Sequence, residues 1–152
     1  MRFPLTVGVL VGGVVLAAPI PKEKEKPKKD EDAIQSIWEL VTTEANGVTV
    51  PAGADTTMRF AFADGKLKLT LVGKPKEQDA TYKLDPDATP KAIDIDEGKG
   101  RTSLGIYELD GDKLRICLAE GKTPVRPTEF KAAGKRVMVV TFKRVKEDKK
   151  EK

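Results

Sequence analysis

The stretch that decides the fold runs from Met58 to Leu71 and reads MRFAFADGKLKLTL. Apolar and polar side chains alternate in it on both sides of Asp64 and Gly65, and this period of two is typical of strands with one buried face. An Asp-Gly pair suits a type I′ hairpin turn, because both central residues of that turn take positive φ. Folding the chain there pairs six apolar side chains on one face: Phe62 with Leu67, Phe60 with Leu69, and Met58 with Leu71. The other face is mainly polar, so the hairpin has one side for a core and one for water.

The sequence around Asp110 and Gly111, LGIYELDGDKLRICLA, repeats this design. The same alternation places a set of small, apolar and aromatic side chains on a common face: Gly105, Tyr107, Leu109, Leu114, Ile116 and Leu118. Cys117 falls on the opposite face. A slip of one residue in the pairing would turn all of these side chains over, so the assignment makes a specific prediction.

Five weaker strand patterns and one helical turn fill the rest of the central region. We expect strands at 38–44, 80–84, 92–96, 128–131 and 136–143, and a helical turn at 33–37. A sheet of eight or nine short strands in so short a chain must curl, and closure removes the edges that would otherwise pair with other chains. The sequence therefore predicts an all-β fold, a small antiparallel up-and-down barrel of eight or nine short strands with flexible tails.

The two ends of the chain differ in composition from the middle. Residues 1–18 combine a short basic start, an apolar stretch and small residues, which is typical of a signal peptide with cleavage near residues 17/18. Residues 19–32 form a charged linker rich in proline, lysine and glutamate, and residues 145–152 form a charged tail, which leaves 33–144 for the barrel domain. We therefore expect export across the cytoplasmic membrane, to the periplasm, the cell envelope or the medium. No integral membrane domain is expected unless the leader stays uncleaved as an anchor.

Composition excludes several kinds of site. The chain has no histidine and only one cysteine, so an imidazole-based zinc site, a Ser-His-Asp triad and an intramolecular disulfide are all impossible within it. The net charge of +4 comes from the two ends, because residues 33–142 carry equal numbers of basic and acidic side chains. A nucleic-acid-binding domain gathers basic and aromatic residues on its folded surface, so we expect no nucleic-acid partner.

The acidic residues and the cysteine are better explained by structure than by chemistry. Asp94, Asp96 and Glu97 lack the ligand spacing of a calcium loop, so we expect no metal site and no cofactor. No acid falls on the predicted inner face, and Glu129 is the nearest candidate for a glycosidase-like role. Cys117 is expected to be partly covered on the barrel exterior. The chain is therefore predicted not to be an enzyme.

Three segments resemble a known family: KLDPDATPKAIDI at 83–95, LGIYELDGDKLRICLA at 104–119 and RPTEF at 126–130. Together they are similar to an uncharacterised lipocalin-like domain family of planctomycete bacteria, and the resemblance covers residues 34–144. Family members open on a motif of the form QGTW, which here reads QSIW, with Ser36 in place of the glycine and Trp38 retained. The resemblance implies a lipocalin-like barrel in an exported protein and implies no established activity.

The aromatic side chains of the inner faces form the candidate site. The interior of an eight-stranded barrel is either filled by side chains or holds one small ligand. The expected lining is Trp38, Phe60, Phe62, Tyr82, Tyr107 and Ile116, with the tyrosine hydroxyls as oriented polar groups. We expect an exported, non-catalytic binding module for a small apolar or amphipathic ligand. The alternative is a protein-interaction or structural domain with a solid core and no ligand.

Overall fold

The elements of the fold follow one another as a short helix and nine strands. The computed structural model describes residues 29–53, 57–74 and 76–146. The elements are α1 (Asp30–Ala33), β1 (Ser36–Ala45), β2 (Val48–Pro51), β3 (Met58–Ala63), β4 (Lys66–Leu71), β5 (Glu77–Asp85), β6 (Ala92–Gly98), β7 (Arg101–Asp110), β8 (Lys113–Ala119) and β9 (Val137–Arg144). The expected signal peptide at 1–18, most of the linker at 19–32 and most of the tail at 145–152 lie outside the described residues.

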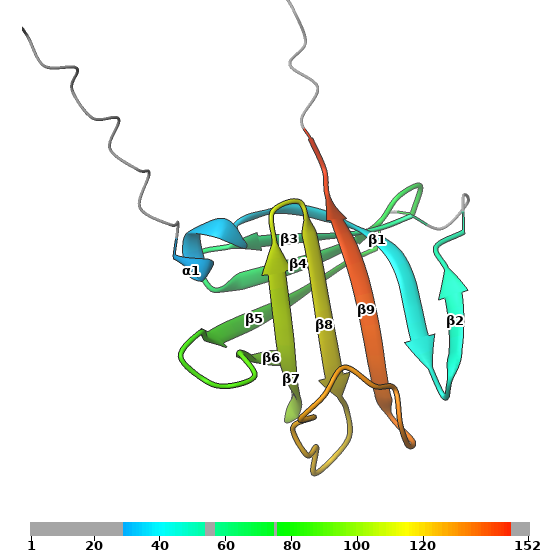
Figure 1. Ribbon diagram of the computed structural model, residues 1–152. Helices are drawn as coiled ribbons and strands as arrows, with labels where there is room; N and C mark the ends of the chain where they lie inside the picture. Colours follow the sequence, from blue (N-terminus) through cyan, green and yellow to red (C-terminus); the bar gives the residue numbers. More distant parts are fainter. Residues whose placement is uncertain (1–28, 54–56, 75, 147–152) are drawn as a thin grey trace, which may run out of the picture.

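The sheet is antiparallel throughout, and it closes on itself. Its strands lie in the order β2-β1-β3-β4-β5-β6-β7-β8-β9, and β1 also pairs with β9 (Figure 1). One edge of β1 is shared, since residues 36–39 pair with β3 and residues 42–45 pair with β2. The result is a closed eight-stranded barrel with β2 as an extra strand beside it. This confirms the predicted all-β barrel.

The two hairpins adopt the predicted faces. Phe62 pairs with Leu67 and Phe60 with Leu69, and Asp64 and Gly65 both have positive φ, as a type I′ turn requires. In the second hairpin the two-residue turn is Gly111-Asp112 and not Asp110-Gly111, because Asp110 pairs with Lys113. That turn is displaced by one residue, which shifts the pairing by two, so the same side chains stay on the inner face.

One expected strand is wrong and one observed strand was not expected. Residues 128–131 form no strand and lie in the 120–136 segment between β8 and β9. Phe130 and Ala132 of that segment pack on the outside of the barrel wall, against Ile106, Cys117 and Val139, so Phe130 does not point into the barrel. The unexpected strand is β2, all of whose residues are exposed. The helical turn begins at Asp30, within the expected linker.

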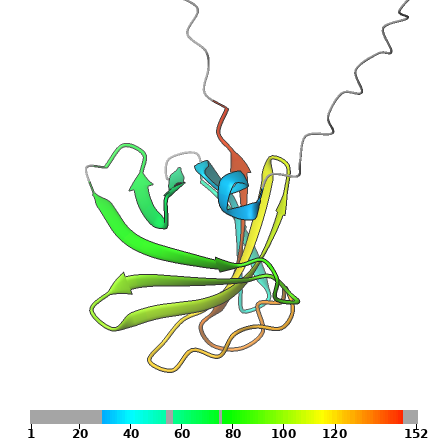
Figure 2. The same cartoon turned by 90° about the vertical axis from the view of Figure 1, so that its left-hand side faces the viewer.

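A helix and two side chains cover one end of the barrel. α1 lies across this end (Figure 2), and the indole Nε1 of Trp38, fully buried, donates a hydrogen bond of 2.8 Å to the carbonyl of Ile34. The guanidinium of Arg144 lies 4.3 Å from the Trp38 ring centroid and donates to the carbonyls of Ala33 and Gly111, at 2.9 and 3.1 Å. Arg144 thereby ties the end of β9 to β1, to α1 and to the β7–β8 turn.

Replacing Arg144 by alanine should destabilise the barrel. We expect the free energy of unfolding to fall by about 2 kcal/mol, because a cation–π contact and the hydrogen bonds to the two carbonyls are lost together. Urea denaturation followed by tryptophan fluorescence measures this loss. The matched control is Lys143→Ala, whose exposed side chain pairs with Glu39 and should cost no more than about 0.5 kcal/mol. Equal losses in the two variants would contradict this role of Arg144.

Candidate binding cavity

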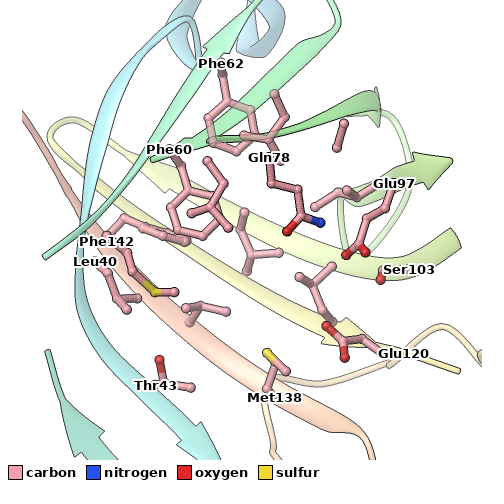
Figure 3. A pocket seen from close by; sticks show the side chains of 18 residues that line it. Leu40, Thr43, Phe60, Phe62, Gln78, Glu97, Ser103, Glu120, Met138 and Phe142 are labelled. Atoms are coloured by element: carbon pink, nitrogen blue, oxygen red, sulfur yellow. The ribbon is translucent and has the colours of Figure 1, made fainter. Parts of the chain in front are cut away.

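The interior of the barrel contains a cavity of about 310 Å³ at the end opposite α1 (Figure 3). Its volume is close to the lower end, about 300 Å³, of pockets that hold small molecules. Its deep part is apolar, and the Phe60 and Phe142 rings meet edge to face there with centroids 4.8 Å apart. The full lining is Leu40, Thr43, Met58, Phe60, Phe62, Leu67, Leu69, Gln78, Ala80, Ile95, Glu97, Ser103, Ile116, Leu118, Glu120, Met138, Val140 and Phe142.

Three of the six expected lining residues line this cavity, and three do not. Phe60, Phe62 and Ile116 face it. Trp38, Tyr82 and Tyr107 belong to the packed core at the α1 end, and the ring of Tyr82 meets that of Phe62 edge to face at 5.0 Å. The aromatic set is therefore divided, and its division marks where the packed half of the barrel ends and the hollow half begins.

The tyrosine hydroxyls do not serve as the polar groups of the cavity. The hydroxyl of Tyr107 donates a 2.7 Å hydrogen bond to Asp30 Oδ2, and Lys91 Nζ donates to the same oxygen at 2.7 Å. Burial, followed by the bond to the Asp30 carboxylate, raises the pKa of Tyr107. Burial also raises the pKa of Tyr82. Tyr107 and Lys91 hold α1 against the barrel through Asp30, and neither tyrosine lines the cavity.

Four polar residues of the cavity lie near strand ends at its mouth: Gln78, Glu97, Ser103 and Glu120. The fifth, Thr43, lies deeper, opposite Val140 in the β1–β9 pairing. Figure 3 shows the carboxylates of Glu97 and Glu120 on the same side of the hollow, with Ser103 between them. The expectation that no acid faces inward is therefore wrong for Glu97 and Glu120.

The sequence does hold the signal that identifies these mouth residues. Extending the inward alternation of Ile93 and Ile95 by one step reaches Glu97, and extending that of Ile116 and Leu118 reaches Glu120. Both glutamates lie beyond the apolar part of their strands, so a pattern based on apolar residues alone stops short of them. Thr43 needs a further observation, the irregularity between Leu40 and Thr42 in the β1–β9 pairing, which changes the inward phase of β1.

The other candidate residues have structural surroundings. Asp94 faces outward and accepts a 2.6 Å hydrogen bond from Arg126, and Asp96 accepts one from the backbone N–H of Gly98, the last residue of β6. Glu129 is exposed in the 120–136 segment. Cys117 faces outward as expected but is fully covered, and burial raises the pKa of its thiol. Across the part of the chain that the structure describes, no three such side chains are grouped to hold a metal ion.

The comparisons with known proteins leave the site to be interpreted from its own geometry. Models of protein families, curated proteins and solved structures give no significant match to the chain. Among the described residues, no helix is long and apolar enough to cross a bilayer.

Stability should depend on pH through Asp30 at the covered end. Burial raises the pKa of this carboxyl, but the hydrogen bonds from Lys91 and Tyr107 outweigh burial and leave the pKa below its ordinary value. A carboxyl with a lowered folded-state pKa stabilises the fold above its unfolded pKa of about 3.9, and this contribution is lost as the pH falls through the folded value. The Asp30→Asn variant should therefore lose about 1 kcal/mol of unfolding free energy at neutral pH.

Denaturation of Asp30→Asn and of the unchanged protein from neutral pH to pH 3 measures this contribution. The difference between the two proteins should shrink below about pH 4. Asp32→Asn is the matched control, because Asp32 lies in the same helical turn with an exposed side chain. A constant difference across the pH range would contradict an ionised Asp30 as the anchor of α1.

Proposed function

We propose that the chain is an exported, non-catalytic, lipocalin-like binding module that holds one small apolar or amphipathic molecule inside the barrel. The observation that carries this proposal is the cavity of about 310 Å³, whose lining is mainly apolar and whose two carboxylates lie at the mouth. Eight-stranded barrels with such an interior have room for one small ligand. An apolar ligand body would replace water in the deep part, and each buried CH₂ group contributes about 0.8 kcal/mol.

The lining supports binding more than catalysis. Its lining is mainly aliphatic and aromatic and includes Phe60, Ile116 and Val140, and such side chains transfer no protons and form no covalent intermediates. The thiol of Cys117 lies on the other side of the wall, under the 120–136 segment. The mouth glutamates are the groups through which a hydrolytic activity would act, so a turnover that depends on Glu97 or Glu120 would contradict the non-catalytic proposal.

The alternative, an interaction domain with a solid core, is disfavoured by the same cavity. A core filled by side chains would leave few voids larger than a water molecule. The packed half of the barrel, around Trp38 and Tyr107, meets that description, and the half around Phe60 does not.

Filling the cavity from within should weaken ligand binding. We expect the full chain to bind the apolar dye N-phenyl-naphthylamine at one saturable site, with a rise in dye fluorescence. Ala80 lines the cavity, so Ala80→Phe should weaken dye binding by at least about ten-fold because the new ring competes for the same space.

The matched control is Ala61→Phe. Ala61 lies between Phe60 and Phe62 on β3 and faces outward, so its replacement should leave dye binding unchanged. Circular dichroism shows whether both variants keep the barrel. An unchanged protein that shows no saturable dye binding, or two variants that bind the dye equally well, would leave the solid-core interaction domain as the better account.

A further inference from the structure

We infer that the ligand carries a positive charge, as an amine or ammonium group at one end of a short apolar body. This inference rests on the proposed function, because it concerns the polar end of a molecule whose apolar part occupies the cavity. It follows from the arrangement of three side chains on neighbouring strands at the mouth: Glu97, Ser103 and Glu120 (Figure 3).

The three side chains supply hydrogen-bond acceptors on the same side of the mouth. Glu97 ends the inward alternation of β6, Ser103 begins that of β7, and Glu120 directly follows β8. Strands β6, β7 and β8 are consecutive in the sheet. An ammonium group has three N–H donors and no acceptor, so this group of two carboxylates and a hydroxyl matches its hydrogen-bonding requirements.

Ser103 is the residue that the packing of the protein does not explain. Among the described residues it is the one polar residue that is buried, with 6% of its surface exposed, and it lines the cavity. Its hydroxyl takes part in none of the side-chain hydrogen bonds between described residues, and no fully covered polar side-chain atom there lacks a partner. The hydroxyl is therefore reachable from the cavity, and a ligand head group at the mouth would bond it in place of water.

Basic residues surround the mouth without entering the cavity. Arg101, Lys122 and Arg136 line an adjoining surface hollow that shares Glu97, Ser103 and Glu120, and none of the three basic side chains lines the cavity itself. Arg101 Nε lies 4.0 Å from Glu97 Oε2, at the limit of an ion pair, and its side chain is largely exposed. Such exposed pairs are weak, so Glu97 remains available to a ligand.

An anionic head group would be placed unfavourably at this mouth. A carboxylate whose tail occupied the cavity would lie against Glu97 and Glu120 as like charges, because these two glutamates line the cavity and the three basic side chains do not. A neutral alcohol would meet no repulsion but would gain only neutral donors and acceptors. The two carboxylates that line the cavity therefore favour the amine first, then the alcohol and then the carboxylate.

Three probes with the same tail separate these head groups: n-octylamine, n-octanol and octanoate. Each is titrated against the full chain with bound N-phenyl-naphthylamine at neutral pH, where the amine is protonated and octanoate is ionised. We expect the affinity of octylamine, measured by displacement of the dye, to be about ten-fold higher than that of octanol. Octanoate should bind most weakly of the three. Added sodium chloride should reduce the preference for octylamine, because the mouth is open to solvent.

Two variants test whether the mouth glutamates cause the preference for octylamine. In Glu97→Gln/Glu120→Gln we expect the preference for octylamine over octanol to disappear, while the affinity for octanol changes less than about two-fold. Glu108→Gln, whose carboxylate pairs with Arg115 on the outer surface, is the matched control and should keep the full preference. Octanol binding also shows that the double variant still folds.

The outcomes distinguish the two proposals. If none of the three probes displaces the dye, or the dye itself does not bind, the proposed function fails. If octanol or octanoate binds as tightly as octylamine, or the double variant keeps the preference, the inference of a cationic ligand is overturned while the binding cavity stands.

Discussion

The pairing of β1 with β9 is the constraint on which the rest of the structure depends. It joins residues 38–45 to residues 138–144, almost the two ends of the described chain, and turns a curled sheet into a closed wall. Every other pairing between barrel strands joins strands that follow one another along the chain, except that β2 lies between β1 and β3. Without the β1–β9 pairing, the apolar faces of the hairpins would line an open sheet with two free edges, which is a template for aggregation.

The two ends of the closed wall differ, and this difference creates the cavity. At one end, large side chains such as Trp38 and Tyr107 fill the interior and α1 covers them, held by Asp30 and Arg144. At the other end the inward positions carry short or polar side chains, such as Ala80, Ser103 and Glu97. The same alternation that builds the core therefore also leaves a hollow, because it continues along each strand after the large residues end.

Much of the fold could be predicted from local sequence. In the hairpin of β3 and β4, fourteen adjacent residues contain the alternation of apolar and polar side chains, the Asp-Gly turn and the apolar face. All three features predict the same pairing. The 120–136 segment could not be predicted in the same way, because Phe130 and Ala132 pack on residues that the strand pattern assigns to the solvent side. An apolar residue in a loop does not by itself cover anything, as the exposed Val125 of the same segment shows. Where such a residue does pack, its neighbours in the sequence do not say on which face.

The candidate site was predictable in its apolar half and missed in its polar half. Phe60, Phe62 and Ile116 were identified because apolar side chains mark an inner face, whereas Glu97 and Glu120 were missed because the apolar pattern ends before them. The depth at which the interior changes from packed to hollow depends on how side chains from different strands meet across the barrel. The sequence could therefore place Trp38, Tyr82 and Tyr107 on the inner face. It could not show that they belong to the packed half of the interior and not to the hollow half.

The most direct test of the account is a crystal structure of the protein under xenon pressure. Xenon enters apolar cavities that have room for it and leaves packed cores unoccupied. The account predicts a single xenon position inside the barrel, among Phe60, Ile116 and Val140, with β1 paired to β9 around it. A barrel interior filled by the rings of Phe60 and Phe142, or a sheet left open between β1 and β9, would contradict it.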